Sequence, residues 1–372
     1  MKYSVIIPVY NRPDECDELL ESLCRQTEQD FEVVVVEDGS QIPCEEVVSK
    51  YADRLKVRYY TKPNSGPGQT RNYGVERAEG EYVLILDSDV VLPEGYMAAV
   101  SAELAATAGE TGSNGMPCEA FGGPDRAHES FTDVQKAINY GMTSFFTTGG
   151  IRGGSTPQSG GVRGALDKFF PRSFNMGIRR DVYTQLGGFS KMRFGEDVDF
   201  SYRLVESGAK CRLFPSAWVY HKRRANFRQF FKQVHNSGIA RINLMKRHPG
   251  TLKLVHMLPA AFTVGVALCL FVCLEAAMFL LKAAVSDGSM AQAMHFVGMR
   301  LLVLGTTPLK VYSIIIFIDS TLRNRSLWVG LLSVIAAFVQ LIGYGTGFIR
   351  CWWQRCLLGR DEFEAFKTNF YK

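Results

Sequence analysis

The chain has 372 residues, of which 47% are hydrophobic and 21% are charged, and its formal net charge is +5. This length is enough for one large domain or two smaller ones with a buried core. The small positive charge gives no support to a nucleic-acid-binding protein. The nine cysteines form no Cys-x-x-Cys pair, so we expect neither a zinc site nor a disulfide framework.

The first part of the chain, residues 1 to about 118, alternates strand-like and helix-like patterns. The expected strands cover 4–9, 31–36, 57–61 and 82–86. The expected helices cover 12–26, 68–78 and about 93–106. This alternation predicts an α/β fold with a doubly wound sheet and right-handed crossovers.

Two later segments allow more than one reading. Residues 149–164 are rich in Gly, Ser and Arg without periodicity, as in a lid over a substrate or in a plain connection. Residues 227–245 form an amphipathic pattern with basic residues between the apolar ones. This helix either lies in a membrane interface or packs on the preceding domain.

The C-terminal third has the composition of a membrane region. Residues 255–274 and 327–349 carry no formal charge, and each is long enough to cross a bilayer as a helix. The segment 296–318 either crosses or lies in the interface, because it is cut into short apolar runs by Arg300, Pro308 and Lys310.

The distribution of basic residues places the N-terminal domain in the cytosol but leaves two and three spans open. Basic residues precede residue 255, and 283–299 carries no Lys or Arg, as expected of an outside loop. Three spans would put the basic tail outside. Two spans, 255–274 and 327–349, would instead expose Arg300, Lys310, Arg323 and Arg325.

The most informative motif is Asp87-Ser88-Asp89, which directly follows the apolar strand 82–86. Ligands of open parallel sheets gather outside the carboxyl ends of the strands. Two carboxylates there offer hard oxygen ligands for Mg²⁺ or Mn²⁺, the usual partners of a diphosphate. The alternative is an ordinary turn, because Asp and Ser are common turn residues.

Three other motifs are expected at the same edge of the sheet. Glu37-Asp38 ends the second strand and offers an acceptor for a pyrimidine N–H or a ribose hydroxyl, or forms a plain Asp-Gly turn. Pro8-Val9-Tyr10-Asn11 ends the first strand. The loop 64–68 enters a helix that carries Arg71, a combination suited to a phosphate but also common without one.

Glu196, Asp197 and His221 are the remaining candidates. Glu196 and Asp197 open a helix, where acidic residues often only cap the helix dipole. A carboxylate held rigidly there is equally suited to act as a general base toward a substrate hydroxyl. His221 follows an apolar stretch and completes a metal site, binds phosphate with its neighbouring arginines, or is structural.

These motifs together resemble the inverting, GT-A-fold glycosyltransferases of family 2, over about residues 3–235. The resemblance is carried by Ser4–Asn11, Glu37–Ser40, Asn64 to Asn72, Asp87–Asp89 and Glu196-Asp197, in that order along the chain. The segment 236–249, which leads into the membrane region, resembles the membrane glycosyltransferases of bacterial exopolysaccharide assembly, including the succinoglycan type.

The resemblance implies a role for each site residue. Asp197 would be the catalytic base and Glu196 would orient the base or the acceptor, while Asp89 and His221 would bind Mg²⁺ or Mn²⁺. The nucleotide-sugar would be bound by Pro8, Tyr10, Asn11, Asp38, Arg71 and Asp87. Glu37 departs from the usual Asp of the family. Because the chain has no Gln-x-x-Arg-Trp motif, we expect transfer of a single sugar and not polymerisation.

The sequence thus predicts a GT-A catalytic domain at 1–235, with a nucleotide-sugar-binding half at 1–118 and an acceptor half at 119–235. An interfacial linker at 226–254, a membrane region at 255–349 with two or three transmembrane helices, and a basic tail at 350–372 follow. We expect a multi-pass protein of the inner (plasma) membrane with its catalytic domain in the cytoplasm.

The expected partners are a nucleotide-diphosphate sugar, a polyprenyl-diphosphate-linked glycan acceptor and membrane lipid, with no nucleic acid. The expected reaction belongs to cell-surface polysaccharide synthesis. Three alternatives remain open. They are direct transfer to polyprenyl phosphate, a processive synthase, which the missing motif and the few spans disfavour, and a non-catalytic scaffold of a polysaccharide-assembly complex.

Overall fold

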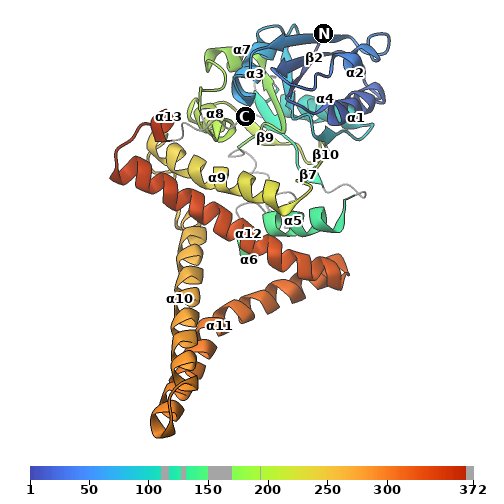
Figure 1. Cartoon of the computed structure of the whole chain (residues 1–372). Helices are drawn as coiled ribbons and strands as arrows, with labels where there is room; N and C mark the ends of the chain where they lie inside the picture. The colour runs from blue at the N-terminus through green and yellow to red at the C-terminus, as the bar shows by residue number, and fades with distance from the viewer. Residues whose placement is uncertain (110–116, 127–130, 150–169, 193, 366–372) are drawn as a thin grey trace.

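The computed structural model describes residues 1–109, 117–126, 131–149, 170–192 and 194–365. Figure 1 shows an α/β domain, two long helices that run side by side beneath it, α9 and α12, and a hairpin of two helices, α10 and α11, that extends away from it. Residues 150–164 of the predicted Gly-rich loop lie outside the described residues.

The domain is built on a seven-stranded sheet with the order β3-β2-β1-β4-β8-β6-β9. The neighbours among β1 to β4 pair in parallel, whereas β8 is antiparallel to β4 and β6. The strands are β1 (Tyr3–Val9), β2 (Phe31–Asp38), β3 (Val57–Lys62), β4 (Tyr82–Leu86), β6 (Ala120–Gly122), β8 (Asn175–Arg179) and β9 (Cys211–Leu213). The sheet is therefore mixed, and its parallel half is the part that the sequence predicts.

A second, three-stranded sheet has the order β5-β10-β7. Its strands are β5 (Val90–Val91), β7 (Asp125–Arg126) and β10 (Val219–His221). Because β5 begins immediately after Asp89, this small sheet brings the late strand β10 to the end of β4.

Helices pack on both faces of the large sheet and form an apolar cluster with each face. Strand β2 is therefore buried along its whole length. The helices of the domain are α1 (Pro13–Cys24), α2 (Glu45–Ser49), α3 (Pro67–Val75), α4 (Tyr96–Ala108), α5 (Asp133–Thr143), α6 (Phe145–Thr148), α7 (Arg180–Gln185) and α8 (Glu196–Glu206). All nine cysteines are free thiols.

The C-terminal part begins with α9 (Phe227–Arg247), which is followed by α10 (Leu258–Ala284), α11 (Gly288–Asn324), α12 (Leu327–Trp352) and α13 (Glu362–Ala365). Short turns, η2 (Leu254–His256) and η3 (Trp353–Leu357), precede α10 and follow α12. Within the described residues, three helices are long and apolar enough to cross a membrane, namely α10, α11 and the segment from α12 through η3.

The segment 296–318, for which crossing and lying in the interface were both open, belongs to one continuous helix, because α11 runs through Arg300, Pro308 and Lys310. Close packing against α10 explains this continuity. A Cβ atom placed on Gly305 would lie only 2.6 Å from Cys273 Sγ, so the two helices are in contact next to the proline. Tertiary contacts of this kind offset the single hydrogen bond that a proline removes.

Candidate active site

The site begins at the end of β4, where the chain turns through Asp87, Ser88 and Asp89 before β5 starts. Strand β10 pairs antiparallel with β5 and sets His221 opposite Val90. The Lys222 amide donates a hydrogen bond of 3.0 Å to the Asp89 carbonyl. One ligand atom each of Asp87, Asp89 and His221 lies within 4.8 Å of the others. The fold thus joins residues more than 130 positions apart.

Asp89 is buried beside two arginines and one histidine. Its Oδ2 lies 2.5 Å from Arg12 Nη1 and 3.6 Å from Arg224 Nη1, and its Oδ1 lies 3.3 Å from His221 Nε2. Burial alone would raise the pKa of Asp89, but His221, Arg12 and Arg224 outweigh burial and hold this pKa below its usual range. Asp89 is therefore an ionised carboxylate at neutral pH.

The residues at this point fit a divalent cation. Two carboxylates and one imidazole form a donor set that suits Mn²⁺ or Mg²⁺. The ring of His221 stacks on Phe174 with centroids 5.0 Å apart, which fixes its orientation. Its Nδ1 atom is buried, has no hydrogen-bond partner among the described residues and lies 4.0 Å from Asp125 Oδ2.

Arg71 connects this cluster to the predicted base. Helix α3 carries its buried guanidinium, which lies 2.7 Å from Asp87 Oδ1 through Nη2 and 3.3 Å from Glu196 Oε1 through Nη1. Burial would lower the pKa of Arg71, but Asp87 and Glu196 outweigh it and raise this pKa. Close packing explains the proximity, because a Cβ atom on Gly68 would lie 2.9 Å from Glu196 Cγ.

Glu196 and Asp197 occupy the first turn of α8, which begins after Gly195 with a left-handed φ of +87°. Burial and the charge of Asp197 raise the pKa of Glu196, against the opposing effect of Arg71. The Asp197 side chain is 27% exposed, and its Oδ2 lies 3.6 Å from Arg172 Nη1. Asp197 is thus the more open of the two carboxylates toward an incoming group.

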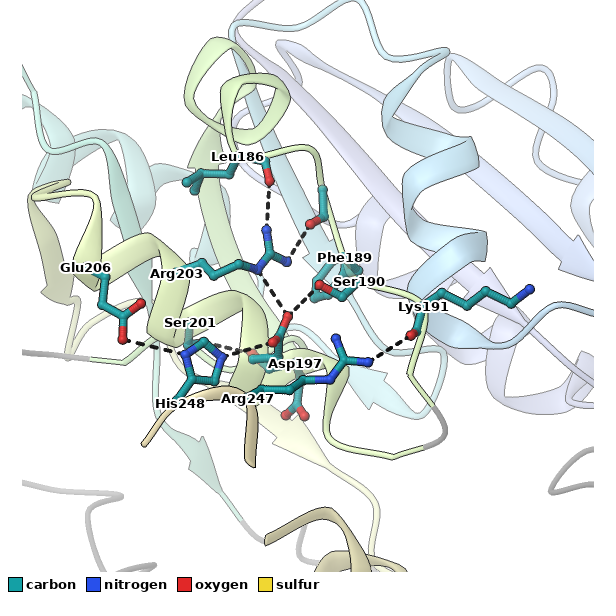
Figure 2. A network of polar contacts seen from close by, with 12 residues as sticks. Leu186, Phe189, Ser190, Lys191, Asp197, Ser201, Arg203, Glu206, Arg247 and His248 are labelled. Atoms are coloured by element: carbon teal, nitrogen blue, oxygen red, sulfur yellow. Dashed lines mark hydrogen bonds and ion pairs between the residues drawn. The ribbon is translucent and has the colours of Figure 1, made fainter. Parts of the chain in front are cut away.

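A buried polar network holds α8 in place (Figure 2). Asp199, one turn from the start of α8, accepts hydrogen bonds from Ser190 Oγ at 2.7 Å and from Arg203 Nε at 3.1 Å. His248, directly after α9, lies 2.9 Å from Asp199 Oδ1 through Nε2. The network therefore ties the helix that carries Asp197 to the end of α9.

Asp38 lies at the end of β2, where its carboxylate holds the loop that precedes α3. Oδ1 accepts from the Ser65 amide and from Lys62 Nζ, and Oδ2 accepts from the Gly66 amide at 2.9 Å. Because this loop leads directly into α3, Asp38 also supports the position of Arg71. The predicted contact of Asp38 with a base stays a prediction.

Glu37, the departure from the family pattern, is also held by donors. Its Oε2 accepts from the Cys44 amide at 2.8 Å and from the Tyr59 hydroxyl at 3.0 Å, and Oε1 accepts from Ser40 Oγ. The longer side chain reaches across the turn after β2, so Glu37 acts as a brace of this turn.

Pro8, Tyr10 and Asn11 lie at the end of β1, beside β2. Pro8 is opposite Val36 in the β1–β2 register. Asn11 has a left-handed φ of +53°, and its Oδ1 accepts from the amides of Gln41 and Ile42 at 2.7 and 3.1 Å. Asn11 therefore shapes the loop after β2, and contacts of these three residues with a nucleotide stay predictions.

Sequence reasoning missed three residues that the fold brings to the site. Arg12 and Arg172 come from different elements and contact the key carboxylates Asp89 and Asp197. Asp125 accepts from Arg223 Nη2 at 2.5 Å and faces His221. Of these three residues, only Arg12 could have been suspected from the sequence, because it directly follows the Pro8–Asn11 motif.

Residues 4–170 match the family model described as glycosyl transferase family 2. The poly(ribitol-phosphate) beta-N-acetylglucosaminyltransferase TarS of Staphylococcus aureus (strain Mu50) is 45% identical over 93 residues, or 24% of this chain and 16% of that protein. A validoxylamine A glucosyltransferase of Streptomyces hygroscopicus subsp. jinggangensis is 28% identical over 230 residues, or 58% of this chain and 54% of that protein. The chain thus spans at most about half the length of these relatives.

Among solved structures, the mannosyltransferase PcManGT from Pyrobaculum calidifontis, in complex with GDP-Man and Mn²⁺, is similar with a TM-score of 0.53 and 14% identity. The similarity covers 95% of this chain and 88% of that one. At this level of identity the similarity concerns the fold, and the predicted GT-A fold is confirmed.

Proposed function

We propose, from the premise that this chain carries a family 2 glycosyltransferase domain at residues 4–170, that it transfers one sugar from a nucleotide-diphosphate sugar to an acceptor hydroxyl with inversion. The observation that carries this proposal is the connection of two carboxylate groups through Arg71. Asp87 and Asp89 with His221 form one end, and Glu196 with Asp197 forms the other. Inversion needs a leaving-group site and a base on opposite faces of one sugar, and the contacts of Arg71 keep these two carboxylate groups close together.

The acceptor side is formed by Asp197. Its carboxylate removes the proton from the acceptor hydroxyl while the hydroxyl oxygen attacks the anomeric carbon. The bond between that carbon and the diphosphate breaks, and the electron pair leaves with the diphosphate oxygen. Because attack comes from the face opposite the leaving group, the anomeric configuration inverts. Glu196, held by Arg71, keeps the first turn of α8 in position.

The donor side is formed by the residues around Asp89. Asp89 and His221, with Asp87 beside them, would hold Mg²⁺ or Mn²⁺, which when bound supplies positive charge for the departing diphosphate. Arg12, Arg71 and Arg224 add positive charge from the chain itself. Preorganised charge of this kind is usually the largest catalytic contribution, about 10²–10³ in rate for each donor group.

The acceptor is expected to be lipid-linked, at the cytoplasmic face of the inner membrane, in cell-surface polysaccharide synthesis of the exopolysaccharide type. Three apolar helices that are long enough to cross a membrane follow the domain and support this expectation. Helix α9, which enters this region, is tied to α8 by the His248–Asp199 contact. A polyprenyl-diphosphate glycan would present its sugar hydroxyl near the membrane surface, where Asp197 could receive it.

The test is a transfer assay on membranes that contain the full chain, with radiolabelled UDP-, GDP- and dTDP-sugars and Mg²⁺ or Mn²⁺. Label is followed into the lipid extract, with polyprenyl phosphate and polyprenyl-diphosphate sugars supplied in separate reactions. Asp197→Asn should lose transfer by a factor of about 10²–10⁴, since an amide cannot take the proton.

The matched control is Asp181→Asn, which changes an exposed carboxylate on α7 that pairs with Arg179. This variant should transfer sugar at the native rate. Transfer at the native rate by Asp197→Asn would refute the assignment of the base. Labelling of polyprenyl phosphate alone would replace the lipid-linked glycan by the simpler acceptor, and no label from any donor would favour the scaffold alternative.

A further inference from the structure

The three helices that are apolar enough to cross a membrane differ in how much of them the protein covers. In the most apolar 18-residue window of α10, 6% of the residues are buried, and in that of α11 the share is 11%. In the window of α12 the share is 50%. A membrane-spanning hairpin leaves most of its surface for lipid, and the rest of the protein leaves most of α10 and α11 uncovered. Helix α12 has another environment.

Helix α12 packs on two helices that adjoin the catalytic domain. A Cβ atom on Gly347 would lie 2.0 Å from the His235 carbonyl oxygen of α9, and one on Gly238 of α9 would lie 2.1 Å from the Tyr344 carbonyl oxygen. Nearer its start, Ala336 lies 3.3–3.4 Å from a Cβ position on Gly141 of α5. The two halves of α12 therefore contact α9 and α5, in turn, along its length.

Helix α9 cannot be a span, and its position fixes that of α12. It carries five Lys or Arg residues in 21 positions. Its start follows His221 by six residues, and the residue after its end, His248, contacts Asp199. Both ends of α9 thus lie against the catalytic domain, and Figure 1 shows α12 running alongside it while α10 and α11 point away.

The end of the chain returns to the catalytic domain. Glu362, at the start of α13, is buried, and its Oε2 lies 3.3 Å from Arg247 Nη2 at the end of α9. The same guanidinium donates to the carbonyl oxygen of Lys191 in the domain. Residues on both sides of the C-terminal membrane region therefore meet on the side of the active site.

From these contacts we infer that α12 does not cross the membrane but lies along its surface on the side of the catalytic domain, with only α10 and α11 crossing. The partner of its outer face is lipid at the boundary between headgroups and acyl chains. Leu327, Leu331 and Ile335 form an exposed apolar stripe at four-residue spacing. Three of the four tryptophans, the residue type enriched at this boundary, are exposed at the two ends of α12, as Trp328, Trp352 and Trp353.

This topology also agrees with the distribution of basic residues. With α10 and α11 as the two crossings, Arg323, Arg325 and the basic tail after residue 349 lie on the cytosolic side, and the loop 285–287 lies outside. Both sets of residues then follow the positive-inside rule. Arg300 and Lys310 remain within the hairpin and Lys282 lies at its outer end, and long side chains of this kind reach toward the interfaces.

The test is protease accessibility of epitope tags in sealed membrane vesicles that contain the full chain. Each protein carries a tag before Met1 as the reference and a second tag either after Lys372 or within 285–287. In vesicles that digest the N-terminal tag, the C-terminal tag should be digested equally and the loop tag should be protected. Detergent should expose every tag.

Protection of the C-terminal tag would mean that α12 crosses, and it would overturn the inference. Digestion of the loop tag together with the N-terminal tag would overturn the crossing of the hairpin. The terminal pair alone decides between an even and an odd number of crossings, so the inference stays testable if an insertion in the loop prevents assembly. Neither result depends on the proposed sugar transfer.

Discussion

The ends of β2 and β4 both carry acidic residues, but the partners of their carboxylates differ. Both strands flank β1 and end at one edge of the sheet. At β2, the carboxylate of Glu37 accepts from the Cys44 amide and from two hydroxyls, whereas Asp38 accepts from two loop amides and also pairs with Lys62 at the end of β3. At β4, Asp87 and Asp89 lie beside three arginines and His221, which come from other elements of the chain.

The groups around a carboxylate determine whether it has a structural role or serves as a ligand. At Glu37, neutral donors satisfy both carboxylate oxygens, and the residue braces the turn after β2. At Asp89, arginine side chains keep the carboxylate ionised, as a ligand of a divalent cation must be. At the same edge of the sheet, Glu37 therefore serves as scaffold, whereas Asp87 and Asp89 belong to the proposed ligand site.

Among the variants that test this comparison, the largest effect on transfer should come from Arg71, which connects the two carboxylate groups. Arg71→Lys keeps the charge but loses the fork that contacts Asp87 and Glu196 at once. The loss of one charge-assisted hydrogen bond, about 1.5–3 kcal/mol, predicts a fall in kcat/KM of about 10–150-fold. Steady-state transfer kinetics would measure this fall.

Its matched control is Arg54→Lys, which changes a half-exposed arginine that pairs with Glu21 on the surface. Native kinetics are expected for this variant, because exposed pairs contribute little. If Arg71→Lys and the native protein had equal kinetics, sugar transfer would not require the contacts by which Arg71 joins Asp87 to Glu196 on α8.

An effect of similar size, on stability instead of transfer and with a defined pH dependence, is expected for Asp199→Asn. Burial alone would raise the pKa of Asp199, but Ser190, His248 and Arg203 lower it. Because the folded pKa lies below the unfolded value of about 3.9, Asp199 stabilises the fold above that pH, and this stabilisation is lost as pH falls through the folded pKa. At pH 7 we expect a loss of about 1.5–3 kcal/mol in the free energy of unfolding.

Thermal unfolding at several pH values would test this expectation, with the exposed Asp53→Asn as the control. The difference between native and Asp199→Asn should narrow as pH falls below about 4. A difference that stays constant over the whole pH range would show that the charge of Asp199 does not stabilise the fold.

The smallest effect should come from the brace on β2. Glu37→Asp shortens the side chain that reaches Cys44 and Tyr59. We expect a loss of about 1 kcal/mol in the free energy of unfolding, since the shorter carboxylate keeps some of its donors. Chemical denaturation would measure the loss, and donor affinity should be unchanged. A loss of donor affinity without a loss of stability would instead indicate that Glu37 belongs to the ligand site.

The sequence predicted the parallel half of the sheet because apolar strands and helical periodicity are local signals. It also predicted that Asp87, Asp89 and His221 lie together, although metal binding was only one of the roles that the sequence left open for His221. It could not show that Arg12 and Arg172 face Asp89 and Asp197, since these contacts join separate elements in the folded chain. Nor could composition reveal that α12 is half covered, because apolar residues suit both lipid and a helix interface.

The most direct test of the contrast between β2 and β4 is the binding of nucleoside diphosphates with and without Mn²⁺. The native protein, Asp89→Asn and Glu37→Asp would be titrated with UDP, GDP and dTDP. We expect Mn²⁺ to tighten the binding of one nucleotide to the native protein and to Glu37→Asp, and we expect Asp89→Asn to lose this gain. An undiminished Mn²⁺ effect in Asp89→Asn would contradict the assignment of the cluster at the end of β4.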